Sequence, residues 1–198
     1  DDDGVGTSLI KTLSHVGTSG TMIVNVRGED RRFIHTLGAN SHLRASDIPW
    51  HEVRRAKVLY VGGYLLMQAL DGHELADVFR QAQAAGVTTV LDVVVPGEGD
   101  HWGRLEPVLP HTDVFLPNDD ESKLITGLDD PRQQAARFAS AGAKTVVITC
   151  GEHGTHLLSG DLRLKAGIFP MTFVGVTGAG DAFDAGYIAG LLQGLDRR

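Results

Sequence analysis

The sequence predicts a layered α/β/α domain built on a mainly parallel central sheet. Four short, almost wholly apolar stretches rich in β-branched residues are typical of strands buried on both faces of such a sheet. They are KVLYV (57–61), TTVLDVVV (88–95), DVFL (113–116) and TVVITC (145–150). Helical patterns separate the stretches, and this alternation favours right-handed crossovers that place helices over the sheet.

The expected helices have recognisable faces and ends. In residues 73–86 the apolar side chains Leu75 and Phe79 share one face, and the closing glycine can end the helix. Another helix is expected after Asp130, with Pro131 in its first turn, where a missing N–H costs nothing. These helices complete the alternation that the layered fold requires.

Residues 21–36 follow a different pattern from the rest of the chain. Two short strand-like runs flank a glycine-containing turn, which predicts a hairpin outside the parallel sheet. No repeat, low-complexity tract or Pro/Ser-rich linker interrupts the sequence, so residues 1–198 are predicted to form a single domain.

Composition excludes several classes of function. The formal charge of −7, without a Lys/Arg block, argues against a nucleic-acid surface. No run approaches the roughly 20 apolar residues of a membrane span. The acidic start DDDGVGTS lacks the features of a signal peptide. Cys150 is the single cysteine, which rules out an internal disulfide. Together these features favour a cytoplasmic protein with neither a nucleic-acid nor a membrane partner.

The stretch GVTGAGDAFDAG (175–186) supports two interpretations. Apolar residues recur every four positions after it (Phe183, Tyr187, Leu191 and Leu195), with a glycine stripe beside them, and predict a buried helix. The helix start could be a plain one, with Asp181 as its cap. Alternatively, the free N–H groups at Gly178, Ala179 and Gly180 could bind an anion, because the small side chains let a phosphate approach the backbone. This stretch alone leaves both interpretations open.

Three motifs, in matching order and spacing, resemble the PfkB/ribokinase family of carbohydrate kinases. GVTGAGDAFDAG is similar to the family's C-terminal signature D-T-x-G-A-G-D. DVFLPNDDESKLITG (113–127) resembles its N-x-x-E segment, with Asn118 and Glu121. TVVITCGEHGTHLL (145–158) resembles the family's strand followed by T-x-G-x-x-G. The motif positions in this chain are Thr149, Gly151 and Gly154.

The resemblance implies a ribokinase-like fold in which residues 21–36 form a small β lid. It implies transfer of the γ-phosphate of ATP to a hydroxyl of a sugar or sugar-like substrate, with Asp181 as general base and residues 178–180 as anion hole. Asn118 and Glu121 would organise Mg²⁺. The nucleotide would be bound by the following residues: Asn118, Thr149, Gly151, Gly154, Gly178 and Gly180. A homodimer through the lid is a further expectation.

Each motif also has a simpler explanation. Asn118 and Glu121 fit a helix capping box, and Gly151 and Gly154 fit a hairpin turn. The family signature begins with Asp where this chain has Gly175, which predicts a weak or empty monovalent-cation site. A nucleotide-binding but inactive or regulatory relative is therefore the alternative function.

Compared with the family pattern, the chain is expected to be incomplete at both ends. The N-terminal segment that carries most sugar contacts and the closing C-terminal helices are not matched. Two other nucleotide-binding classes are disfavoured. The sequence contains no G-x-x-x-x-G-K-[ST] motif, and Phe183 stands where a dinucleotide fingerprint needs its last glycine.

Overall fold

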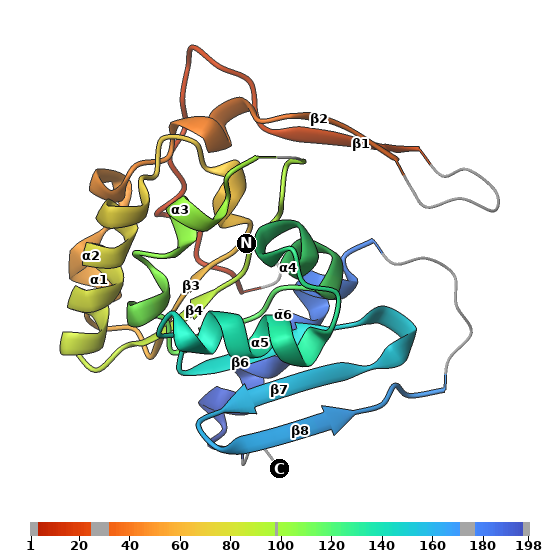
Figure 1. Cartoon of the computed structure of the whole chain (residues 1–198). Helices are drawn as coiled ribbons and strands as arrows, with labels where there is room; N and C mark the ends of the chain where they lie inside the picture. The colour runs from red at the N-terminus through yellow and green to blue at the C-terminus, as the bar shows by residue number, and fades with distance from the viewer. Residues whose placement is uncertain (1–3, 25–31, 98, 171–176, 196–198) are drawn as a thin grey trace.

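A six-stranded sheet forms the centre of the fold (Figure 1). The structure is a computed structural model that describes residues 4–24, 32–97, 99–170 and 177–195. The strands lie in the order β3-β4-β5-β6-β7-β8. Their bounds are Val58–Val61 (β3), Thr88–Leu91 (β4), Val114–Phe115 (β5), Thr145–Thr149 (β6), Thr155–Ser159 (β7) and Leu162–Ala166 (β8).

Strands β3 to β6 are parallel, and β7 and β8 continue the sheet as antiparallel strands. The mainly parallel sheet predicted from the sequence is therefore confirmed. Each of the four apolar stretches supplies one of the parallel strands. The second is shorter than predicted, because β4 ends at Leu91 and the polar Asp92 follows it.

Helices connect the strands and cover the sheet. The longer helices are α2 (Gly72–Ala84), α4 (Asp119–Thr126), α5 (Pro131–Ser140) and α6 (Ala179–Leu192), and the shorter ones are α1 (Trp50–Val53) and α3 (Trp102–Leu105). Short 3-10 turns lie at Gly38–His42, Ala45–Asp47, Tyr64–Leu66, Leu109–His111 and Gly151–His153. As predicted, Asp130 caps α5 by accepting the Arg132 N–H at 2.9 Å, and Pro131 is its first residue. None of the helices in the described ranges has the length and apolarity that crossing a membrane requires.

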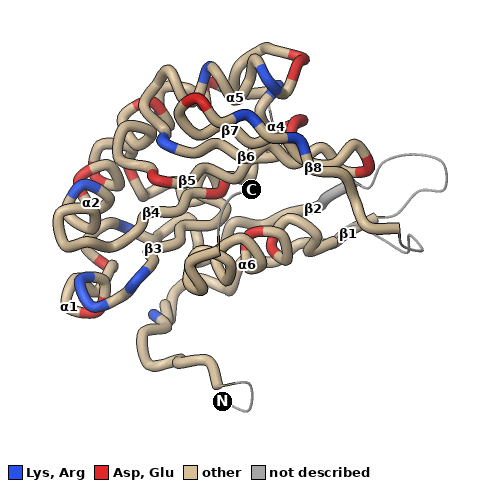
Figure 2. Tube along the Cα trace, turned by 90° about the horizontal axis from the view of Figure 1, so that it is seen from below, with Lys and Arg blue, Asp and Glu red and all other residues tan. Residues whose placement is uncertain are grey.

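The helices form two layers around the sheet (Figure 2). On one face, α2, α4 and α5 cover a core that contains the fully buried rings of Phe79, Phe115 and Phe138. On the other face, α6 packs against the strands through a smaller apolar cluster. That cluster joins Val90, Val114, Leu116 and Val147 of the sheet region to Phe183, Tyr187, Ile188 and Leu191 of α6.

Helix α6 is less buried than the sequence predicted. Only one of its faces packs on the sheet, and Leu192 and Leu195 are 48% and 63% exposed. An added Cβ at Gly186 would meet nothing within 4 Å. The predicted burial is wrong, since most residues of α6 are exposed or half-buried and Asp184 is the one buried residue among those that the structure describes in it.

A separate antiparallel pair, β1 (Gly20–Val24) and β2 (Arg32–Thr36), projects away from the central sheet (Figure 1). The strands correspond to those predicted within residues 21–36, and the turn between them lies outside the described residues. Met22 is paired with Ile34, and both side chains are about two-thirds exposed at 64% and 65%. The pair therefore presents apolar surface.

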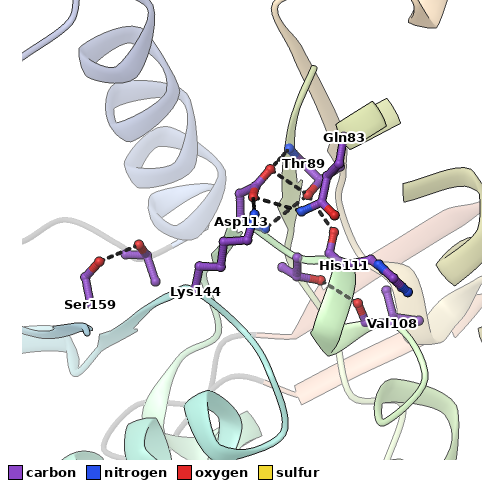
Figure 3. A network of polar contacts seen from close by, with 9 residues as sticks. Gln83, Thr89, Val108, His111, Asp113, Lys144 and Ser159 are labelled. Carbon is purple, nitrogen blue, oxygen red and sulfur yellow. Dashed lines mark hydrogen bonds and ion pairs between the residues drawn. The ribbon is translucent and has the colours of Figure 1, made fainter. Parts of the chain in front are cut away.

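A polar network ties the amino ends of the central strands together (Figure 3). One oxygen of Asp113 accepts from Gln83 Nε2 at 2.8 Å and Lys144 Nζ at 2.7 Å, and the other accepts from the Thr89 N–H at 2.9 Å. Burial acts to raise the pKa of Asp113, but the hydrogen bonds from Lys144, Thr89 and Gln83 outweigh it and lower the pKa below its usual value. Asp113 is therefore an ionised carboxylate held by donors from α2, from β4 and from the residue before β6.

Replacing Asp113 should destabilise the fold in a pH-dependent way. Asp113→Asn should lower the free energy of unfolding by about 1–3 kcal/mol at pH 7, since donors lose their acceptor. The folded pKa is lowered, so this stabilisation is present above the ordinary aspartate pKa near 4 and disappears as the pH falls through the folded pKa. Urea unfolding of the full-length protein at pH 7 and pH 3.5 measures this. Asp77→Asn, at an exposed pair with Arg80, is the control and should change stability by less than about 0.5 kcal/mol. Equal losses in both variants would contradict the assignment.

Candidate active site

The carboxyl ends of the four parallel strands meet at one edge of the sheet. β3 ends there in Gly62 and Gly63, β4 in Asp92, β5 in Pro117 and Asn118, and β6 in Thr149. Asn118 and Thr149 lie side by side in an isolated parallel bridge, and the Thr149 N–H donates to the Pro117 carbonyl at 3.2 Å. Two residues predicted to bind the nucleotide are thus neighbours at this edge. Ligand sites in open α/β sheets form at such edges.

Asn118 and Glu121 form a capping box at the start of α4. The Glu121 N–H donates to Asn118 Oδ1 at 2.8 Å, and the Asn118 N–H donates to Glu121 Oε2 at 3.1 Å. The capping interpretation of these residues is therefore confirmed. Capping does not test a role of Glu121 in holding a metal ion, and that role stays a prediction.

The predicted glycine motif lies in the connection between β6 and β7. Gly151 and Gly154 both have positive φ, +51° and +87°, and the Cys150 N–H donates to the Gly154 carbonyl at 2.8 Å. A Cβ on Gly154 would lie 2.0 Å from the carbonyl oxygen of Ala166. Gly154 is thus required by the turn itself, and nucleotide binding by Thr149, Gly151 and Gly154 stays a prediction.

Helix α6 begins at the residues predicted to form the anion hole. Gly178 is the N-cap, with φ +77°, and its carbonyl accepts the Ala182 N–H at 2.9 Å. Asp181 is the third residue of the helix, so the interpretation of Asp181 as the cap is wrong. Gly178 has no side chain with which to cap the first turn, and residues 177–181 are exposed. N–H groups in the first turn of a helix have no partner within it, so these can face an anion.

Two acidic residues that the sequence reasoning did not select lie near the predicted ones. Asp92 Oδ2 accepts the Gly63 N–H at 3.0 Å. Burial raises the pKa of Asp92 to about 8, and the charges of Asp184 and Glu121 add to this, against the lowering effect of the Gly63 N–H. Burial likewise raises the pKa of Asp184 to about 6, opposed by a hydrogen bond from Tyr60 and reinforced by the charge of Asp181.

Glu121 belongs to the same acidic cluster. Burial raises the pKa of its carboxyl to about 7, the charge of Asp184 adds to this, and the Asn118 N–H opposes it. We use the name carboxylate cluster for Asp92, Glu121, Asp181 and Asp184. Acidic residues with strongly shifted pKa values, placed at the edge where parallel strands end, are typical of functional sites.

Some signals for the missed residues were present in the sequence. Asp92 interrupts an apolar run, and Asp184 shares a helical face with Ile188 and Leu191, which is unusual for a charged residue. Tyr60 gave no signal, because its contact with Asp184 joins residues 124 positions apart.

Other candidate residues contribute less to the site. Cys150 is buried, and burial raises the pKa of its thiol to about 11. Gly175 lies outside the described residues, so the expected weak monovalent-cation site stays a prediction. Within the described ranges, no group of three or more His, Cys, Asp or Glu side chains is arranged to hold a metal ion unaided.

Comparison with known proteins identifies relatives of the whole chain. The family described as pfkB family carbohydrate kinase matches residues 1–198. An ATP-dependent 6-phosphofructokinase from Thermoanaerobacterium thermosaccharolyticum is 33% identical, over 98% of this chain and 65% of its own length. A ribokinase from Haemophilus influenzae is 30% identical, over 96% of this chain and 61% of its own length. The chain thus spans less than two thirds of the length of each of these two relatives.

Solved structures share the fold. A ribokinase from Arabidopsis thaliana, complexed with ribose and ATP, superimposes with a TM-score of 0.79 at 22% identity. The match covers 99% of this chain and 64% of that one. The ribokinase-like layered α/β architecture is therefore confirmed.

The raised pKa of Asp92 predicts a stability change of defined sign. Between pH 4 and pH 8 the folded state holds a proton on Asp92 that the unfolded state releases, so stability falls as the pH rises through this range. Asp92→Asn cannot ionise and can still accept the Gly63 N–H. The variant should match the wild-type protein at pH 5 and be more stable at pH 9 in urea unfolding. Asp113→Asn is the control of opposite sign. A loss of stability in Asp92→Asn at pH 9 would refute the assigned burial.

Proposed function

The chain belongs to the pfkB family of carbohydrate kinases. We propose that the site at the carboxyl ends of its parallel strands transfers the γ-phosphate of ATP to a hydroxyl of a sugar or sugar-like acceptor. The observation that carries the proposal is the first turn of α6. It combines uncapped N–H groups after Gly178 with the carboxylate of Asp181, beside the sheet edge that carries Asn118 and Thr149.

In the proposed reaction, the acceptor hydroxyl attacks the γ-phosphorus while Asp181 takes its proton. The new O–P bond forms as the bond from the γ-phosphorus to the β–γ bridging oxygen breaks, and ADP leaves with that electron pair. A modest base suffices, since phosphoryl transfer has a loose transition state in which positioning and charge stabilisation dominate. The N–H groups of Gly178, Ala179 and Gly180 would stabilise charge on the phosphoryl oxygens.

The charge of the carboxylate cluster bears on nucleotide binding. A polyphosphate would meet repulsion from ionised carboxylates there unless a cation intervenes. Burial is the main cause of the raised pKa values of Asp92 and Glu121, and the negative charge of Asp184 adds to both. Mg²⁺ fits this donor set, because it takes one or two carboxylates and completes its shell with water and phosphate oxygens. Glu121 and Asn118 would hold it, and it would neutralise charge on the transferred phosphoryl group.

The acceptor is proposed as a class only. The relatives carry the names ribokinase and 6-phosphofructokinase, so sugars and sugar phosphates are the first acceptors to test. We also propose that the β1–β2 pair acts as a lid and dimer contact, since it presents Met22 and Ile34 to solvent. The competing function is a nucleotide-binding relative without turnover, and it predicts ATP binding with no phosphorylated product.

The role of Asp181 predicts a selective loss of turnover. In the full-length protein, Asp181→Asn should lower kcat by about 10²–10⁴-fold, because the acceptor proton loses its base, while ATP affinity stays within a few-fold. Steady-state kinetics and ATP titration measure the two effects. Asp161→Asn, on the exposed β7–β8 turn, is the control and should retain wild-type activity. Near wild-type turnover by Asp181→Asn would remove Asp181 from the mechanism.

The role of Glu121 predicts a changed metal requirement. Glutamine preserves the capping box but removes the charge, so Glu121→Gln separates the two roles. The Mg²⁺ concentration for half-maximal activity should rise by about 10-fold or more. Asp129→Asn, at an exposed ion pair with Lys123, serves as control and should leave the Mg²⁺ titration unchanged. An unaltered titration for Glu121→Gln would leave Glu121 with its capping role alone.

A further inference from the structure

Asp184 is the one residue that α6 buries among those the structure describes. Asp184 is only 4% exposed, whereas the apolar residues of α6 that contact the sheet are half-buried. Burying a carboxylate is unfavourable unless it is hydrogen-bonded. The position of Asp184 therefore requires a specific partner.

Tyr60, on β3, is that partner. Its hydroxyl donates to Asp184 Oδ2 at 2.8 Å. Burial, and after it the negative charge of Asp92, raise the pKa of the phenol well above its usual range, so Tyr60 stays a proton donor. The tyrosine is itself 38% exposed, so packing does not fix its ring on every side. The hydrogen bond is what directs it to α6.

The end of β3 is shaped for this contact. A Cβ on Gly62 would lie 2.6 Å from the Tyr60 oxygen and 2.8 Å and 2.9 Å from two ring carbons. The ring therefore lies directly over Gly62, a position that any other residue would obstruct. The next residue, Gly63, has φ +65° and donates to Asp92. Tyr60 in β3 and Gly63 just after the strand thus each contact one member of the carboxylate cluster.

The pair lies where it can control the first turn of α6. Asp184 comes three residues after Asp181, which is about one helical turn. The apolar contacts of Phe183, Tyr187, Ile188 and Leu191 hold α6 on the sheet, but such contacts are non-directional. A hydrogen bond restricts both distance and angle, so it can fix where the helix stands along and around its axis.

We propose that Tyr60 and Asp184 form a positioning pair that holds Asp181 and the Gly178–Gly180 turn in register with the sheet edge. The inference rests on the proposed phosphotransfer function and assigns two residues to its geometry. Neither residue needs to touch the acceptor. Catalysis is sensitive to such positioning, because a displacement of about 1 Å can lower turnover on the order of 100-fold.

Three variants of the full-length protein test the pair. Tyr60→Phe removes the donor, Gly62→Ala displaces the ring while leaving both partners intact, and Asp184→Asn keeps an acceptor oxygen without the charge. The assay uses MgATP with the acceptor that the wild-type protein turns over fastest among D-ribose, D-fructose, D-fructose 6-phosphate and adenosine. Melting temperature is measured alongside kcat and both KM values.

Tyr60→Phe and Gly62→Ala should each lower kcat on the order of 10-fold and leave the KM for ATP within about two-fold. The double variant should be no slower than either single one, because both changes break the same bond. Asp184→Asn should retain most of the activity that Tyr60→Phe loses. Ile188→Val, in the apolar contact of the same helix, is the packing control and should lower the melting temperature without changing kcat.

A purely structural role would give a different pattern. If Tyr60→Phe lowers the melting temperature like Ile188→Val but leaves kcat unchanged, the positioning role is overturned, as it is if the two losses multiply in the double variant. Asp181→Asn separates this failure from failure of the proposed function. Loss of turnover in Asp181→Asn with none in Tyr60→Phe rejects the positioning pair alone, and unchanged turnover in both removes Asp181 from the mechanism as well. Only the absence of a phosphorylated product from the wild-type protein rejects the phosphotransfer assignment itself.

Discussion

The parallel arrangement of β3 to β6 is the constraint on which the candidate site depends. Because these strands share one direction, residues far apart in the sequence end at the same edge, and Gly63, Asp92, Asn118 and Thr149 converge there. Register matters equally, since a shift of one residue would turn every side chain of a strand to the opposite face. The Asp92 N–H donates to the Val61 carbonyl at 2.9 Å, which fixes the edge where β3 and β4 end.

The carboxylate cluster gathers acidic side chains at that edge, and hydrogen-bond donors partly offset the cost of burying them. Asp92 accepts from the Gly63 N–H, Glu121 from the Asn118 N–H, and Asp184 from the Tyr60 hydroxyl. Each donor lowers the pKa of its carboxyl, yet burial and neighbouring charge keep all three values raised. An arrangement that opposes stability in this way is expected where a bound cation or proton transfer gives it a use.

Sequence reasoning recovered the parts of the fold that depend on local patterns. The apolar stretches, Asp130 with Pro131, and the helix after Gly178 all carry periodic or capping signals. It failed where contacts between distant residues determine the end of a strand, the burial of a helix or the partner of a side chain. Strand β4 stops at Leu91 because Asp92 turns to Gly63, α6 packs on one face only, and the Tyr60–Asp184 bond leaves no pattern in the sequence. The resemblance located Asp181, Asn118 and Glu121, but their electrostatic neighbours required the folded chain.

Phosphorus NMR of the full-length protein with MgATP and a panel of sugars detects the proposed phosphoryl transfer itself. We expect one or more acceptors to yield a new phosphomonoester resonance, formed in equal amount with ADP, because the γ-phosphoryl group passes to an acceptor hydroxyl. The panel should include pentoses, hexoses, sugar phosphates, keto-sugar acids and nucleosides. ATP binding without any phosphomonoester product, or release of inorganic phosphate in place of transfer, would contradict the proposed phosphotransfer.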